Sequence, residues 1–101
     1  MGYSVIILDT AQSEYESIVS YLAGSLQNKS AAQNFMAEFE RQIEFITEQP
    51  FLRPLSHLPE LAARGYRKAP INKYVMLYKV IGQTIIVAHV FHQTQDDGHL
   101  A

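Results

Sequence analysis

The sequence contains no cysteine, and no hydrophobic stretch in it is long enough to cross a membrane. The absence of cysteine excludes disulfides, thiolate zinc sites and cysteine nucleophiles together. The apolar run over residues 5–8 is far shorter than the hydrophobic core of a signal peptide or a transmembrane helix, and no basic segment precedes it. From these absences we expect a cytoplasmic protein without a membrane partner.

Two further kinds of site are missing from the pattern of residues. There is no glycine-rich phosphate loop, because Gly24 stands alone inside an expected helix. No pair of carboxylates stands with a histidine at the spacing of metal ligands, and His89 with His92 does not by itself make a metal site. We therefore expect no metal ion and no cofactor.

Acidic residues are also absent from residues 61–95, although the whole chain has a formal net charge of −2. Residues 1–60 carry eight acids against three bases, a net charge of −5. The bases of the acid-free stretch are Arg64, Arg67, Lys68, Lys73 and Lys79. Two interpretations stay open: strands that place lysine and arginine on a solvated face, or a basic face for an anionic partner.

The 101 residues are enough for one hydrophobic core, so we treat residues 1–101 as a single domain. Residues 3–8 are apolar and β-branched, which predicts a strand. Apolar residues then recur at helical spacing from residue 11 to about residue 27, and again from Ser30 until Pro50 ends the pattern. Ser30 and Gln33 form a capping box for the second helix. The short connection makes the two helices an antiparallel hairpin.

The second half of the chain has the pattern of strands. Prolines at several positions between residues 50 and 60 predict a loop first. Strands are predicted over residues 65–70, 74–80 and 84–91, with turns at Asn72 and Gly82. Because these connections are short, neighbouring strands should be antiparallel. The sequence therefore predicts an α+β fold in the order β-α-α-β-β-β, an antiparallel sheet of three to four strands with the N-terminal helical hairpin packed on one face.

Three segments of the second half carry a resemblance to a known family. They are residues 65–68 with Arg67, residues 72–80 with Tyr74 and Tyr78, and residues 90–96 with His92 and Asp96. In this order, behind an aromatic-rich first strand and a helical hairpin, they resemble the RelE/ParE superfamily, the toxins of type II toxin–antitoxin systems, which include plasmid-stabilisation proteins. The resemblance covers almost the whole chain and implies a cognate antitoxin as partner.

The superfamily divides by target, so the resemblance implies two activities. RelE-like members are metal-independent endoribonucleases that cut mRNA on the ribosome, and ParE-like members inhibit DNA gyrase. The strand arginine of the nucleases matches Arg67 and their C-terminal histidine matches His92, whereas the basic tail and the glutamate base found in individual nucleases have no match. We interpret the chain first as a ribosome-dependent mRNA endoribonuclease. The alternatives are a non-enzymatic gyrase inhibitor and a degenerate relative that only binds antitoxin.

Metal-free RNA cleavage uses the 2′-hydroxyl as nucleophile, so it needs a base, an acid and a cationic group for the developing phosphorane charge. Arg67 would grip the phosphate with its planar guanidinium. His92 would serve as acid or base, because a histidine side chain ordinarily titrates near neutral pH. Tyr78 completes the predicted catalytic set. The predicted substrate-binding residues, which supply point charges and a stacking ring, are Lys68, Lys73 and Tyr74.

Several of these residues also have a purely structural interpretation. Tyr74 and Tyr78 should share a strand face, so both could be sheet core with their hydroxyls satisfied at its rim. Arg67 could be an ordinary solvated strand arginine. Alternation along the last strand places His89 on the face of Val87, where a histidine is more often structural than catalytic.

Overall fold

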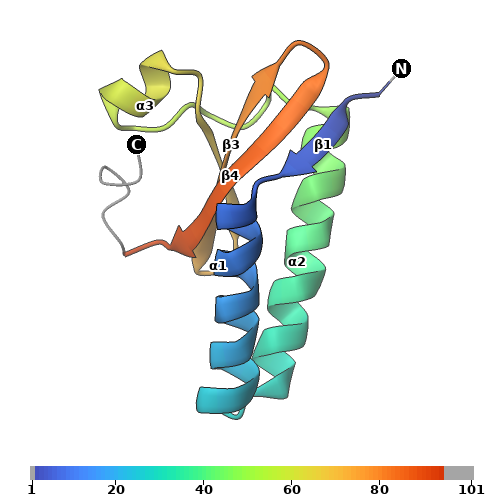
Figure 1. Cartoon of the computed structure of the whole chain (residues 1–101), viewed down its shortest axis with the longest axis vertical. Helices are drawn as coiled ribbons and strands as arrows, with labels where there is room; N and C mark the ends of the chain where they lie inside the picture. The colour runs from blue at the N-terminus through green and yellow to red at the C-terminus, as the bar shows by residue number, and fades with distance from the viewer. Residues whose placement is uncertain (1, 95–101) are drawn as a thin grey trace.

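Most of the chain is built into a four-stranded sheet and two long helices that lie against one of its faces (Figure 1). The computed structural model describes residues 2–94. Its elements in chain order are β1 (Ser4–Ile7), α1 (Asp9–Ser20), the π-helical turn η1 (Tyr21–Ser25), α2 (Lys29–Glu48), α3 (Pro59–Ala63), β2 (Arg67–Ile71), β3 (Tyr74–Ile81) and β4 (Thr84–His92). The predicted α+β class is confirmed. No helix in this described part is both long and apolar enough to cross a membrane.

The helical hairpin turns through a π-helical segment that the sequence did not predict. α1 runs on into η1, where the N–H of Leu26 donates to the carbonyl of Tyr21 at 2.9 Å. α2 is then capped by Asn28, whose Oδ1 accepts from the N–H of Ala31 at 3.0 Å. The cap therefore lies two residues before the predicted capping box at Ser30, which corrects that prediction.

The sheet has the strand order β1-β4-β3-β2. Strands β2, β3 and β4 form the predicted antiparallel meander. β1 runs parallel to β4, with Ser4 opposite Thr84, so the sheet is mixed and the prediction of a wholly antiparallel sheet needs this correction. The inference from short connections does not apply to β1, because both long helices separate β1 from the meander in the sequence. A crossover of that length allows parallel neighbours.

β4 contains one extra residue, because Leu77 of β3 pairs with His89 whereas Tyr78 pairs with Val87. The bulge shifts the alternation of side chains in the rest of the strand. Val87 and Val90, three residues apart, consequently pack in the same hydrophobic cluster. The prediction that His89 shares a face with Val87 is therefore wrong, since His89 lies beside Leu77 in the register.

The two faces of the sheet carry separate hydrophobic clusters. The larger cluster lies between the sheet and the helical hairpin and includes Phe35 of α2 and Tyr78 of β3. The smaller cluster joins Leu61 of α3 to Leu77 on the opposite face. The hairpin thus covers one face as predicted. α3 was predicted as loop because of its prolines, but Pro59 occupies the first helical turn, where proline is tolerated.

Candidate functional site

The predicted site residues lie in three places on the sheet. Arg67 pairs with Tyr78 across β2 and β3, and Tyr74 pairs with His92 across β3 and β4. Tyr74 and Tyr78 are four residues apart in β3, which separates the two pairs by about 13 Å along the strand. Lys68 follows Arg67 in β2 and therefore projects from the opposite face. We call the first pair the Arg67 end and the second pair the His92 end.

At the Arg67 end, the guanidinium holds the loop that follows α2. Arg67 Nη1 donates to the carbonyl of Arg53 at 2.8 Å and to that of Phe51 at 3.3 Å. The guanidinium carbon lies 5.2 Å from the centre of the Phe51 ring, which adds a cation–π contact. The loop then runs along the outer edge of β2, where the N–H of Lys68 donates to the carbonyl of Pro54 at 3.1 Å. Arg67 therefore fastens this loop to the sheet on the side away from β4.

Tyr78 fastens the same loop from inside the core. Its side chain is 0% exposed, and its hydroxyl donates to the carbonyl of Pro50 at 2.8 Å. Burial raises the pKa of Tyr78, while the positive charges of Arg67 and Arg53 partly oppose that effect. The phenol is consequently a neutral donor at physiological pH. In this position Tyr78 has no surface left for contact with a substrate.

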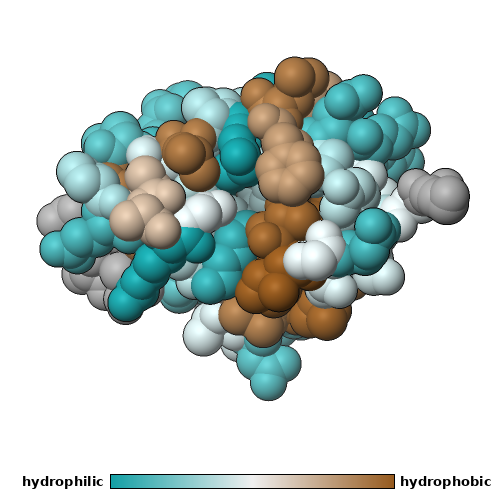
Figure 2. Space-filling view, turned by 90° about the horizontal axis from the view of Figure 1, so that it is seen from above, coloured by the Kyte–Doolittle hydropathy of each residue, from teal (hydrophilic) through white to brown (hydrophobic). Residues whose placement is uncertain are grey.

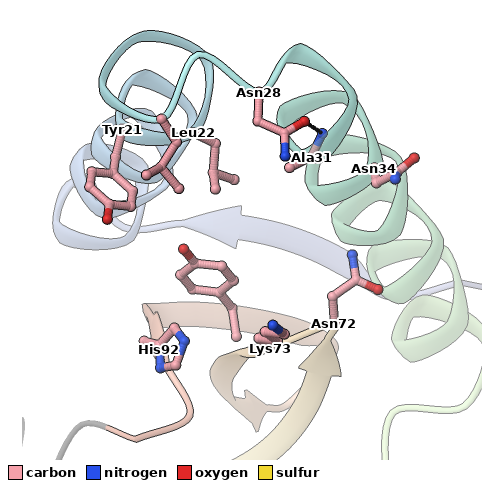
Figure 3. Close-up of a pocket in the computed structure, with 10 residues that line it drawn as sticks. Tyr21, Leu22, Asn28, Ala31, Asn34, Asn72, Lys73 and His92 are labelled. Atoms are coloured by element: carbon pink, nitrogen blue, oxygen red, sulfur yellow. Dashed lines mark hydrogen bonds between the residues drawn. The ribbon is translucent and has the colours of Figure 1, made fainter.

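A pocket of about 490 Å³ opens at the His92 end, between the turn that joins the two long helices and the turn that joins β2 to β3 (Figure 3). Lys73, Tyr74 and His92 all line it, so the structure brings these predicted residues together. The Tyr74 ring lies edge to face with the His92 ring, at 5.2 Å between centres. Burial raises the pKa of Tyr74, and the nearby phenol of Tyr21 raises it further.

The remaining bases of the acid-free stretch are spread over the opposite face. Lys68 Nζ lies 3.1 Å from His57 Nδ1, and Lys79 Nζ lies 4.8 Å from the centre of the Tyr66 ring. The bases therefore do not converge on one pocket. Asp96, the last position of the resembling motif, is outside the described residues. Within residues 2–94, no three histidines, aspartates or glutamates gather in a way that could hold a metal ion.

Glu14 is a structurally important residue that the sequence did not single out. Its Oε1 accepts from the N–H of Val90 at 2.9 Å, and its Oε2 lies 3.2 Å from Nδ1 of His89. On the same helix, Thr10 Oγ1 donates to the carbonyl of Ala88 at 2.9 Å. These side chains form hydrogen bonds with backbone groups of β4 beyond the point where β1 ends. No local signal could reveal this, because Glu14 and its backbone partner are 76 positions apart.

Exposed apolar side chains gather at the end of the molecule formed by β1, the β3–β4 turn and the loop after α2. Figure 2 views this end from above and shows a hydrophobic band across it. The side chains of Phe51, Leu52 and Ile81 are large and apolar, yet they are 57%, 66% and 55% exposed. We call these three residues the apolar band. Contiguous apolar surface of this kind commonly marks an interaction site.

The chain is similar in structure to proteins of toxin–antitoxin systems. A chain of the chromosomal ParDE toxin–antitoxin system from P. aeruginosa matches it with a TM-score of 0.70 and 14% identity, over 89% of this chain and 95% of that one. A chain of the RelBE2 toxin–antitoxin complex from Mycobacterium tuberculosis matches with a TM-score of 0.53 and 14% identity, over 91% and 99%. No curated protein matches the sequence.

At 14% identity, these likenesses establish the shared fold alone. The sequence itself matches a family, the ParE toxins of the type II toxin–antitoxin system parDE, over residues 5–97. That range covers nearly the whole chain and includes both the Arg67 end and the His92 end. The predicted membership of the RelE/ParE superfamily is confirmed, and the chain belongs to its ParE toxin family, the toxin components of type II toxin–antitoxin systems.

Proposed function

We propose that this toxin inhibits DNA gyrase and does not cut RNA. The observation that supports the proposal is the separation of the Arg67 end from the His92 end, about 13 Å along β3. In metal-free cleavage, the phosphate-binding group and the general acid or base must each come within about 3 Å of the same phosphodiester. Arg67 instead directs its guanidinium to loop carbonyls on the side away from β4.

Membership of the ParE family supports the same target, because gyrase inhibition is the activity that the resemblance implies for ParE-like members. In this proposal Arg67 and Tyr78 are structural residues. Both bind carbonyls of the loop that carries Phe51 and Leu52. Their role is to hold the apolar band in place, and no chemical step is assigned to them.

An mRNA endoribonuclease is the second candidate, and one observation favours it. Lys73, Tyr74 and His92 line a single pocket. In that candidate His92 would move the proton, Lys73 would neutralise the phosphate and Tyr74 would stack on a base. The His92 end would then have to cleave RNA without the guanidinium of Arg67.

A test in cells separates the candidates. The toxin is expressed without its antitoxin, and growth, plasmid linking number and the 5′ ends of translated mRNAs are measured together. We expect growth to stop and plasmids to lose negative supercoils, with no new mRNA ends. New ends inside translated mRNAs that disappear in the His92→Gln variant would support the nuclease instead. Unaffected growth would indicate a relative that only binds antitoxin.

For the antitoxin, we propose that the apolar band is part of the docking surface. Antitoxins of this superfamily have a segment that folds on the toxin, and such a segment buries apolar side chains. Replacing Leu52 and Ile81 together by serine and threonine should weaken antitoxin binding at least about tenfold, because each side chain contributes roughly 1.5 kcal/mol or more when buried. Leu26→Ser is the matched control, since Leu26 is 52% exposed at the other end. If Leu26→Ser weakened antitoxin binding as much as the double replacement, the apolar band would be excluded as the docking surface.

A further inference from the structure

The face of the sheet turned away from the helical hairpin, which we call the open face, is only partly covered. Strand alternation places Leu77 and Lys79 of β3 on this face. Leu61 of α3 packs against Leu77 at one end of it. Toward the β3–β4 turn the face stays exposed, because Ile6 of β1 is 51% exposed there and Ile81 is 55% exposed.

A row of side chains crosses this exposed part from strand to strand. Ile6 pairs with Ile86 across β1 and β4, and Ile86 pairs with Lys79 across β4 and β3. Beyond Lys79 lies Tyr66, whose ring centre is 4.8 Å from the lysine Nζ. Lys79 therefore extends its stem along apolar neighbours and holds its ammonium group over an aromatic ring.

Lys68 places a second cation beside the row. It pairs with Leu77 across β2 and β3, two residues from Lys79 along β3. The two lysines are thus diagonal neighbours on one face, about 7–8 Å apart. Lys68 Nζ donates to His57 Nδ1 at 3.1 Å, since a lysine ammonium has donors only. Each lysine is therefore positioned by a ring.

Neither lysine is neutralised by a carboxylate in the described part of the chain. The ion pairs within residues 2–94 are Arg41 with Glu38 and His89 with Glu14. Like charges on neighbouring strands destabilise a sheet when nothing compensates them. A partner that brings negative charge to the open face would remove this repulsion and gain two charge pairs.

The surroundings of the lysines favour an acidic protein segment over DNA as that partner. Binding to the DNA backbone depends on many phosphate contacts made by a continuous basic surface. Here Lys79 stands between Ile86 and a tyrosine ring, and residues 1–60 carry a net charge of −5. Apolar surface bordered by a few charges is instead the usual composition of a protein–protein interface.

We propose that the open face binds an acidic segment of gyrase, whose carboxylates meet Lys68 and Lys79 and whose apolar side chain packs on Ile86. This inference rests on gyrase inhibition as the function and adds the surface and the chemistry of the contact. It also gives a route for neutralisation. Ile81 of the apolar band follows Lys79 by two residues in β3, so an antitoxin docked on the band borders the open face.

The test compares two double charge reversals in the full-length toxin. Lys68→Glu with Lys79→Glu reverses the open face. The matched control, Lys29→Glu with Lys73→Glu, changes the net charge equally at exposed positions in α2 and in the β2–β3 turn. Binding to purified gyrase without DNA and inhibition of supercoiling are measured for each. We expect the open-face reversal to weaken both at least about tenfold and the control to match the wild type.

Two further measurements complete the experiment. Circular dichroism with thermal unfolding checks the fold, and Lys68→Gln with Lys79→Gln, which removes the charges without reversing them, provides the measurement if the reversal does not fold. This variant should weaken gyrase binding by a smaller factor. Binding of the toxin to linear DNA alone is measured in parallel, and we expect none that depends on the two lysines.

Three results would overturn the inference. If the wild type and both reversals stop supercoiling equally, the open face is not the contact, although gyrase inhibition stands. If the open-face reversal abolishes binding to DNA alone, the partner of the lysines is nucleic acid and not an acidic protein segment. If the wild type itself leaves supercoiling intact, the proposed function fails and the inference fails with it.

Discussion

Replacing Tyr78 with phenylalanine separates the structural from the catalytic interpretation of this residue. The ring, which is 0% exposed, keeps its shape and packing, and only the hydroxyl that donates to the carbonyl of Pro50 is lost. A buried carbonyl that loses its donor costs about 1–3 kcal/mol. For a domain of this size each kcal/mol lowers Tm by about 4–8 °C. We therefore expect a clearly less stable protein whose activity per folded molecule is unchanged.

Thermal unfolding followed by circular dichroism measures the first half of this prediction, and supercoiling by gyrase at a temperature where the variant is folded measures the second. Tyr21→Phe is the control, because Tyr21 is 51% exposed and the change should leave Tm unaffected. An unchanged Tm for Tyr78→Phe combined with loss of activity would refute the structural role and return Tyr78 to the catalytic set.

Two more predictions concern α1 and the buried tyrosines. Glu14→Gln replaces the carboxylate that accepts from the N–H of Val90 by a neutral amide. We therefore expect the free energy of unfolding to fall by about 1 kcal/mol and amide exchange at Val90 to become faster. Unchanged exchange at Val90 would contradict this contact. Burial raises the pKa of Tyr15, Tyr74 and Tyr78 above 10.0, so the stability they contribute is complete below pH 10.0 and is lost as pH rises through the higher folded values. Urea unfolding across this pH range measures the free energy of unfolding, and absorbance at alkaline pH follows the formation of tyrosinate. A free energy of unfolding that did not fall above pH 10.0 would contradict this prediction.

Local sequence signals were sufficient for the meander but not for the connections around it. Asn72 and Gly82 mark its two turns, and both adopt the positive φ that such turns require. The direction of β1 depends on how a helical hairpin packs back onto the sheet, which no short segment encodes. The short helix α3 was missed because proline is a helix breaker inside a helix but a good first residue, and its burial of Leu61 is a tertiary contact.

The site was predictable as a set of residues and not as a geometry. The period of a strand correctly placed Tyr74 and Tyr78 on one face. It could not show that their partners across the sheet differ, with His92 opposite Tyr74 and Arg67 opposite Tyr78. The carbonyl that fixes the Tyr78 hydroxyl is 28 positions away in the chain. Whether an arginine or tyrosine serves a substrate or a neighbouring loop is decided by such distant contacts.

The most direct measurement is supercoiling of relaxed plasmid by purified DNA gyrase in the presence of the purified toxin, beside a translating extract that reports mRNA cleavage. We predict that the toxin stops supercoiling, that prior binding of the antitoxin prevents this, and that mRNA in the extract stays intact. Full supercoiling at saturating toxin, with mRNA cut in the extract, would contradict the proposed function.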